Sequence, residues 1–326
     1  MRRHSATFVI RVALAAVLSA GAAPALAQNY PSKPVRVIVP TAPGGGVDIL
    51  ARVLGQKLSE QLGVQFVVDN RPGAAGNIGN GLAAKAAPDG YTVLTAPSAI
   101  AMGATLYSHI TYDVVKDFAP ISQLASTPYF IVLHPSVPAN DVRQLIALAK
   151  AHPGQLTYAS AGAGSASHLA GELLKRMAGV DIVHVPYKGI GPAMTDVLAG
   201  HVSFIIAGLA PAKPQVEAGK LKIIAVADAK RSSLMPKVAT VAESGLPGYA
   251  VENWIGMFAP AGTPAAIVRK LNNETLKALN GAGTHQQLAA QGLEPIGSSP
   301  EEFARTIKTE VEKWARFIKE TGIRSD

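Results

Sequence analysis

The stretch VRVIVPTAPGGGVDILARVLGQKLSEQLGVQFVVD, residues 35–69, decides the fold class. It opens with a run of mostly β-branched residues, Val35–Val39, which predicts a strand that ends before Gly44–Gly46. Leucine then recurs at every fourth position over residues 50–62, which predicts a helix with one apolar face. A second strand is predicted over Gln65–Asp69. A strand, a helix and a strand at this spacing predict a parallel βαβ unit.

The same alternation continues along the chain and predicts an α/β protein. Further strands are predicted at Tyr91–Thr95, Tyr129–His134, Leu156–Ala159, Ile182–Pro186, Val202–Ile206, Lys222–Ala227 and Val251–Ala259. Helices are predicted at Asp141–Ala151, Ser167–Met177, Pro192–Ala199 and Lys213–Ala218, and two more begin at Thr263-Pro264 and Ser299-Pro300. The last helix opens with a capping box and has an apolar face, so we expect it to pack back on the first part of the chain.

Composition excludes several classes of protein. The chain has 326 residues and no cysteine, which excludes disulfide scaffolds, cysteine-ligated metal sites and thiol nucleophiles. With 48 % hydrophobic residues it has enough apolar side chains to build a core, which argues against disorder. Its formal charge is +8, from 30 basic and 22 acidic residues.

The first 27 residues have the pattern of a secretory signal peptide. Arg2, Arg3 and Arg11 precede an apolar run over residues 12–23, and Ala25-Leu26-Ala27 is a small-residue cleavage site. An apolar run of about 12 residues is too short for a membrane anchor, which needs roughly 20. Cleavage after Ala27 would leave 27 basic against 22 acidic residues, a net charge of +5. We therefore expect export to the periplasm.

The remaining basic residues do not cluster, so nucleic-acid binding is not expected. The length after cleavage predicts two lobes. Breaker residues at Ser126-Thr127-Pro128 and Pro247-Gly248-Tyr249 suggest that the chain crosses between them twice. The predicted organisation is a signal peptide (1–27), the first part of lobe 1 (28–127), lobe 2 (128–248), and a return to lobe 1 with the C-terminal helices (249–326).

Motifs of catalysis are missing from the sequence. It has no Gly-x-Ser-x-Gly elbow, no Ser-x-x-Lys pair, no His-Glu dipeptide and no P-loop. His134, His184 and His201 are interpreted as core or edge histidines. Neighbouring side chains at a helix start diverge, so the adjacent pair Ser167-His168 is not expected to be catalytic. We expect neither a cofactor, nor a metal site, nor catalytic residues.

Two glycine-rich turns stand between a strand and a helix, Thr41–Asp48 and Ser160–His168. Glycine lets the backbone approach a ligand closely, and the first amides of a helix are unpaired donors beside a partial positive charge. These turns therefore predict anion binding at the carboxyl ends of their strands. A third turn, Pro186–Asp196, adds Lys188, which either pairs with a carboxylate or is simply solvated.

Several blocks of the sequence resemble those of one family. They are VPTAPGGGVD (39–48), DNRPGAAGN (69–77), PDGYT (88–92), VPYKG (185–189) and APAGTP (259–264). Their order over the whole chain after the leader is similar to that of the Bug family, the extracytoplasmic solute receptors of tripartite tricarboxylate transporters. The resemblance implies a periplasmic binding protein of type II. Such a protein has two lobes with mixed, mainly parallel sheets and a ligand cleft between them.

The resemblance also implies a ligand and a site. The ligand would be a small organic anion: a di- or tricarboxylate, an acidic amino acid or an aromatic acid. Carried over onto this sequence, the ligand-binding residues are Thr41, Ala42, Gly44, Gly45, Asp48, Ser98, Ser160, Ala161, Gly162, Gly164, Ser165, His168, Lys188 and Gly189. The chain departs from the family pattern at Thr41, where an aromatic residue is frequent, and at Ala163, Ser203 and Ala207, so the identity of the ligand stays open.

We expect a monomeric, non-catalytic receptor that delivers its ligand to membrane transporter subunits. Two other functions remain as alternatives. A ligand sensor for a signalling system would bind the same anions, and an exported enzyme that processes a carboxylate would use Asp48, His168 or Lys188 as acid or base.

Overall fold

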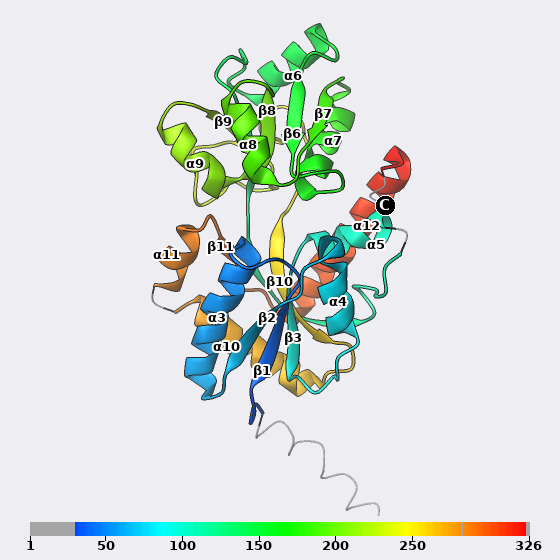
Figure 1. The fold of residues 1–326 in the computed structure, drawn as a ribbon, viewed down its shortest axis with the longest axis vertical. Coiled ribbons are helices and arrows are strands. Elements are labelled where there is room, and N and C mark those ends of the chain that lie inside the picture. The colour runs from blue at the N-terminus through cyan, green and yellow to red at the C-terminus, as the bar shows by residue number, and fades with distance from the viewer. Residues whose placement is uncertain (1–29, 108, 282, 324–326) are drawn as a thin grey trace, which may run out of the picture.

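The computed structural model describes residues 30–107, 109–281 and 283–323. The predicted signal peptide, residues 1–27, lies outside the described residues. Figure 1 shows two lobes stacked along the long axis of the molecule, each built on one sheet. Among the described residues, no helix has the length and the apolar character needed to cross a membrane.

Lobe 1 contains a six-stranded sheet in the order β11-β4-β10-β3-β1-β2. Its strands are β1 (Val35–Val39), β2 (Phe66–Asn70), β3 (Thr92–Pro97), β4 (Phe118–Ser126), β10 (Trp254–Pro260) and β11 (Glu294–Pro295). The helices are α3 (Gly46–Leu62) and α10 (Ala265–Leu279) over one face, α4 (Asn77–Ala84), α5 (Ala99–Leu106) and α12 (Pro300–Thr321) over the other, and α11 (Thr284–Ala289) beside β11. A short 3-10 turn, η1 (Ala74–Gly76), precedes α4. The core thus lies on both faces of the sheet.

Lobe 2 contains a five-stranded sheet in the order β7-β6-β8-β5-β9. Its strands are β5 (Tyr129–Leu133), β6 (Thr157–Ser160), β7 (Val183–Pro186), β8 (Phe204–Gly208) and β9 (Lys222–Val226). Helices α6 (Val142–Ala151) and α7 (Ala166–Ala178) cover one face, and α8 (Ile190–Leu198) and α9 (Leu209–Glu217) cover the other.

The two lobes and the mixed sheets are as expected, but parallel pairings do not predominate. Of the nine pairings between the described strands, four are parallel and five antiparallel. Each antiparallel pair includes at least one of the strands next to the crossings between the lobes, which are β4, β5, β9 and β10. The sequence pattern did not predict β4, because Pro120 and polar residues interrupt its apolar alternation.

The chain crosses between the lobes at two adjacent segments. The first leaves β4 through Thr127, and the second reaches β10 through Asn253. The Thr127 amide donates to the Asn253 carbonyl at 2.7 Å, and Asn253 Nδ2 donates to Thr127 Oγ1 at 2.6 Å. Tyr249 and Val251 belong to the core of lobe 2 and Trp254 to that of lobe 1, so the second crossing follows the expected breaker residues by a few positions.

Helix α12 spans both lobes. Phe303 and Ile307 pack in the core of lobe 1, whereas Trp314, Phe317 and Ile318 belong to a cluster that joins α5 of lobe 1 to the core of lobe 2. Helix α12 packs along α5 and β4 of lobe 1, and its second half also contacts residues of lobe 2. Its second half stabilises the position of lobe 2 against lobe 1.

Candidate functional site

The two glycine-rich turns lie at the facing edges of the lobes (Figure 1). The first connects β1 to α3, and the second connects β6 to α7. Each turn follows the carboxyl end of a strand with parallel neighbours, where ligands of α/β sheets bind.

The first turn ends at the start of α3. Gly44 has φ +86°, a left-handed conformation that side chains other than glycine rarely adopt. Gly45 precedes the helix, and among the described residues no side chain caps the amides of its first turn. These amides have no acceptor within the helix, so they can donate to an anion above it. Thr41 and Ala42 lie between β1 and this helix start.

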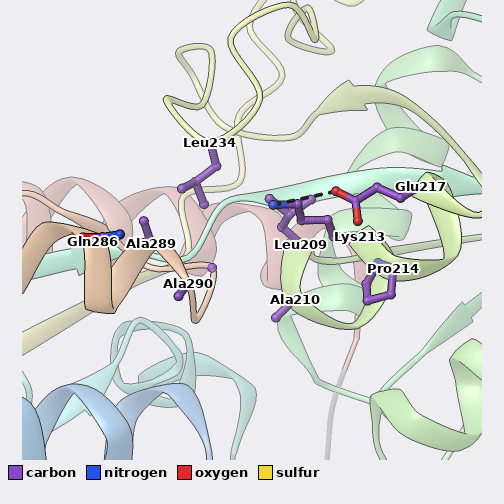
Figure 2. Close-up of a pocket in the computed structure, with 10 residues that line it drawn as sticks. Leu209, Ala210, Lys213, Pro214, Glu217, Leu234, Gln286, Ala289 and Ala290 are labelled. Atoms are coloured by element: carbon purple, nitrogen blue, oxygen red, sulfur yellow. Dashed lines mark ion pairs between the residues drawn. The ribbon is translucent and has the colours of Figure 1, made fainter.

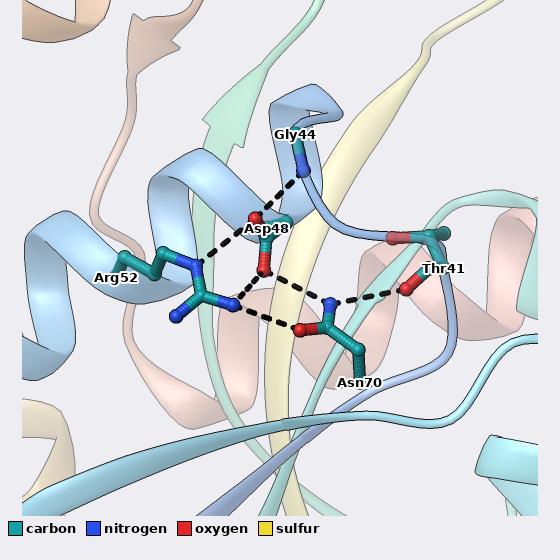
Figure 3. Close-up of polar contacts among 5 residues, drawn as sticks. All are labelled: Thr41, Gly44, Asp48, Arg52 and Asn70. Atoms are coloured by element: carbon teal, nitrogen blue, oxygen red, sulfur yellow. Dashed lines mark hydrogen bonds and ion pairs between the residues drawn. The ribbon is translucent and has the colours of Figure 1, made fainter.

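Asp48 holds the first turn in place (Figure 3). Its side chain is almost fully buried, and Oδ2 accepts from the Gly44 amide at 2.8 Å and from Arg52 Nε at 3.0 Å. Oδ1 accepts from Asn70 Nδ2 at 2.9 Å and pairs with Arg52 at 3.0 Å. Burial raises the pKa of Asp48, but the hydrogen bonds from Arg52, Gly44 and Asn70 and the Arg52 charge outweigh it and hold the pKa below its usual value.

This carboxylate is therefore ionised, and both of its oxygens accept hydrogen bonds from neighbouring residues. A second carboxylate beside it would be repelled. We assign Asp48 to shaping the turn rather than to touching a ligand. Asn70 completes the anchor, because its Nδ2 also donates to the Thr41 carbonyl at 3.1 Å. The Thr41 hydroxyl, in contrast, is a buried atom without a hydrogen-bond partner in the described part of the chain. Such a hydroxyl is suited to contact a ligand or a water.

The second turn is ordered by its own hydroxyl groups. The Ala161 amide donates to Ser167 Oγ at 2.9 Å and the Gly162 amide to Ser160 Oγ at 3.1 Å. Ser165 caps α7, since its Oγ accepts from the His168 amide, and it donates to the Gly162 carbonyl at 2.6 Å. The sequence argument expected the amides of this turn to face an anion, but those of Ala161 and Gly162 are used inside the turn.

Replacement of Gly162 by any other residue would strain the backbone of the second turn. Its φ is +129°, and a Cβ at this position would lie 3.0 Å from the Tyr187 carbonyl oxygen, which belongs to the turn after β7. Gly189, in that same turn, donates its amide to the Ala161 carbonyl at 3.1 Å. The turns after β6 and β7 thus form one unit. Lys188 is an exposed side chain at the tip of this unit.

Two histidines lie beneath the second turn. The Gly164 amide donates to His168 Nδ1 at 3.0 Å, so a neutral His168 carries its proton on Nε2. The ring stacks on that of His184 with 4.0 Å between centroids, and His184 Nε2 lies 2.7 Å from Ser160 Oγ. Burial lowers the pKa of His168, and burial with the nearby His168 lowers the pKa of His184 to about 4. Both rings are neutral near pH 7.

His184 is the main residue of the site that the sequence did not reveal. It was interpreted as a core histidine because nothing near it in the sequence suggested chemistry. His184 could have been found from the pairing of the strands, because it lies in β7 directly opposite Tyr158 of β6, the strand that leads into the second turn. Arg52 of α3 and Asn70 of β2, which anchor the first turn through Asp48, were missed in the same way.

Ser98 follows β3, whose carboxyl end lies at the same edge of the lobe 1 sheet as the end of β1, where the first turn begins. It is fully buried after β3, where its Oγ donates to Asn253 Oδ1 at 2.9 Å and its amide donates to the Trp254 carbonyl. This predicted ligand residue therefore contacts the segment that crosses between the lobes. Ser203 lies at the opposite end of lobe 2 from the second turn, since its Oγ accepts from the Thr157 amide at the start of β6, whereas Ala207 is buried near the carboxyl end of β8.

Comparisons with known proteins show the family and the fold of the chain. A family model described as "Tripartite tricarboxylate transporter family receptor" matches residues 50–323. Protein BugT of Bordetella pertussis is 37 % identical over 324 residues, 99 % of this chain and 98 % of BugT. An R. palustris protein solved with adipate has a TM-score of 0.78 at 37 % identity, with 91 % of this chain and 99 % of that chain covered. MatC from Rhodopseudomonas palustris, solved with malate, has a TM-score of 0.73 at 32 % identity, with 88 % and 99 % covered.

Proposed function

We propose that this chain, which belongs to the tripartite tricarboxylate transporter receptor family, captures a small organic carboxylate in the periplasm and delivers it to a membrane transporter of that type. The observation that carries the proposal is the pair of strand–glycine–helix turns on facing edges of the two lobes. Each turn leads into the N-terminus of a helix of three or more turns, where backbone donors and the helix dipole favour an anion.

The two turns would act together on one ligand. The uncapped first-turn amides of α3 and the Thr41 hydroxyl would donate from lobe 1. The first turn of α7 and the Nε2–H of His168 would donate from lobe 2. A carboxylate that contacts both lobes binds the closed arrangement better than the open one, so it shifts the population toward closure. We propose that the paired segments at Thr127 and Asn253 are the hinge between the lobes, with boundaries near residues 127 and 253.

Transport rather than catalysis is proposed because of how the candidate groups are placed. Ser160 and His184 lie within hydrogen-bond distance, but Ser160 is fully buried and cannot present a nucleophile to a substrate. Asp48 is ionised and fully hydrogen-bonded, which makes it a poor general base.

Di- and tricarboxylates, acidic amino acids and aromatic acids are the ligands we propose, and the adipate and malate bound to similar proteins support this class. We further propose export of the chain with cleavage after Ala27, and a monomeric receptor.

Calorimetry and thermal unfolding of the chain from Gln28 onward test the proposal. Succinate, malate, adipate, citrate, glutamate and benzoate are added separately. A ligand present at 100 times its dissociation constant should stabilise the fold by about 2.7 kcal/mol. The bound acid should be recovered unchanged after release. Conversion of the acid would establish the enzyme alternative, and absence of binding by every acid would refute the receptor proposal. Pull-down with the transporter membrane subunits, compared with a sensor kinase, tests delivery against signalling.

A further inference from the structure

The loop after β9 lies between the two crossings of the chain. The Ala227 amide donates to the Tyr129 carbonyl at 2.7 Å, and the Val251 amide donates to the Ala227 carbonyl at 2.9 Å. Tyr129 follows the first crossing, and Val251 precedes the second. Asp228, the next residue of the loop, is therefore held in lobe 2 beside both of the segments that connect the lobes.

The side chain of Asp228 contacts lobe 1. Ser126, the last residue of β4, donates from Oγ to Asp228 Oδ2 at 3.2 Å. The other oxygen, Oδ1, is a buried atom without a hydrogen-bond partner in the described part of the chain. A buried carboxylate oxygen without a donor costs much more free energy when it is charged than when the carboxyl group is protonated. This position therefore favours Asp228 with its proton.

Lobe 1 also places a carboxylate beside this group. Glu294 of β11 is paired with Ser126 in the sheet, and its Oε1 accepts from Ser232 Oγ at 2.5 Å and from the Leu234 amide at 3.1 Å. Ser232 and Leu234 belong to the loop that follows Asp228. These hydrogen bonds join β11 to lobe 2, so the described arrangement of the lobes brings together one acidic group from each lobe.

The titratable groups that face Asp228 from other elements are acidic or uncharged. Burial and the charges of Glu252 and Glu294 raise the pKa of Asp228 to about 7, although the hydrogen bonds from Ser126 and the Tyr129 amide lower it. The phenols of residues 129 and 249 stay uncharged, since burial raises their pKa values. Three further charged groups act on Glu252, namely Glu310 and Lys313 of α12 and Lys230 of the loop.

The lobes have room to move beside this contact. Figure 2 shows a hollow of about 550 Å³ between α9 of lobe 2 and α11 of lobe 1. The walls meet at Gly292, where a Cβ would lie 3.3 Å from the Ala210 amide nitrogen. Leu293 and Leu234 belong to separate cores. On this side a rotation about the crossings would therefore break the Glu294 hydrogen bonds without opening a shared core.

We propose that Asp228, with Ser126 and Glu294, forms a proton-dependent latch between the lobes. With its proton, Asp228 stays buried against Ser126 and the lobes keep the described arrangement. Without the proton, its charge and that of Glu294 repel each other, and the lobes rotate about the crossings until Ser126 and Glu294 no longer cover it. This inference rests on the hinge movement of the proposed function and adds a dependence on pH to that movement.

The direction of the effect follows from where the proton is bound more tightly. The described arrangement holds the proton of Asp228 up to a pH of about 7, whereas an exposed aspartate loses it near its usual value of 3.8. Acid therefore favours the described arrangement, and a rise in pH through about 7 favours the rotated one. Because one proton is involved, the ratio of the two arrangements changes by at most about tenfold per pH unit.

Pulsed electron resonance between two spin labels tests the latch in the absence of any ligand. The chain has no cysteine, so Gln56→Cys on α3 and Thr195→Cys on α8, both exposed, place one label on each lobe. Over a series from pH 5.5 to pH 8.5 the distance between the labels should change, with a midpoint near 7. Asp228→Asn should keep the low-pH distance throughout. Asp181→Asn, which removes an exposed carboxylate from the same lobe, should behave as the wild type.

Glu294→Gln gives a second test that does not depend on the folding of Asp228→Asn. It keeps the Oε1 acceptor and removes one negative charge, so the midpoint should move to lower pH. A wild-type distance that does not change with pH, or an equal change in Asp228→Asn, would overturn the latch. Either result would leave the receptor proposal intact, because no ligand is present. Failure of all six acids named above to bind would refute the receptor proposal, and the distance measurement would still decide the latch.

Discussion

Replacement of Asp48 by asparagine separates a structural anchor from a ligand contact. The carboxylate accepts from the Gly44 amide and from Arg52 on one oxygen, and from Asn70 and Arg52 on the other. An asparagine amide presents a nitrogen in place of one oxygen, so whichever way it is turned it faces two donors. One buried donor left without an acceptor costs about 1–3 kcal/mol. Loss of the ion pair adds at most about 1 kcal/mol, because Arg52 is half exposed.

The expected loss is therefore about 2–3 kcal/mol in the free energy of unfolding at pH 7, measured by urea denaturation of the chain from Gln28 onward. Asp181→Asn is the matched control, since its carboxylate is 64 % exposed and lies 3.9 Å from Lys175, and it should cost less than about 0.5 kcal/mol. The pH dependence follows from the lowered pKa. The stabilisation by Asp48 is complete above its unfolded pKa, and it is lost as the pH falls through the lower folded pKa. An unchanged unfolding free energy together with a weakened ligand affinity would refute the anchor and place Asp48 in contact with the ligand.

Three further variants test other parts of the site. Gly162→Ala adds a Cβ at φ +129° and 3.0 Å from the Tyr187 carbonyl oxygen. The variant should keep the far-UV circular dichroism of the fold but lower ligand affinity at least tenfold. Wild-type affinity would show that the conformation of the second turn does not matter for binding. Thr41→Val removes a buried hydroxyl that has no hydrogen-bond partner among the described residues. The unfolding temperature should stay equal or rise, while ligand affinity falls. A lower unfolding temperature would mean that the hydroxyl has a structural partner. His184→Gln should remove part of the loss of stability on acidification. The pKa of His184 is lowered from 6.5 to about 4 in the folded protein, so the unfolded state binds more protons in that interval and the free energy of unfolding falls as the pH drops from 6.5 toward 4. An equally steep fall in the variant would contradict this.

The local parts of the fold were predictable from the sequence. The strand at Val35–Val39, the helix that follows and the turn between them depend on β-branched runs, four-residue spacing and glycines that act within one βαβ unit. The resemblance to a receptor family, read from five blocks of sequence, is confirmed by the comparisons.

Elements that depend on close packing were missed. Helix α4 contains Gly79 and Gly81, which weaken the helical pattern, yet a Cβ on Gly79 would lie 2.9 Å from Pro40 Cα. The glycine is there because α4 packs directly on the chain after β1. A sequence pattern does not distinguish such a glycine from one in a loop.

The two turns of the candidate site were predicted from the sequence, but the hydrogen-bond partners that order them were not. The partners that decide which amides face outward are distant in sequence: Asn70 lies 22 residues from Asp48, and His184 lies 24 residues from Ser160. These contacts arise only when parallel strands are placed side by side. The expected contacts of Asp48 and Ser98 with a ligand stay predictions, and each side chain also has a protein partner that local spacing does not reveal.

Helix α12 gives the molecule an optical reporter of its own. The chain has only two tryptophans: Trp254 begins β10 at a crossing between the lobes, and Trp314 of α12 lies in the cluster that joins α5 of lobe 1 to lobe 2. Trp314 Nε1 donates to the buried Glu310 carboxylate at 2.7 Å, and Lys313 lies over the same indole at 4.9 Å from its centroid. Those two charged groups belong to the same helix and move with the ring, but the lobe 2 side chains in its cluster do not. A rotation of lobe 2 against lobe 1 would therefore change the packing and the water exposure of this buried ring, so the wavelength of its emission would report the movement without any attached dye.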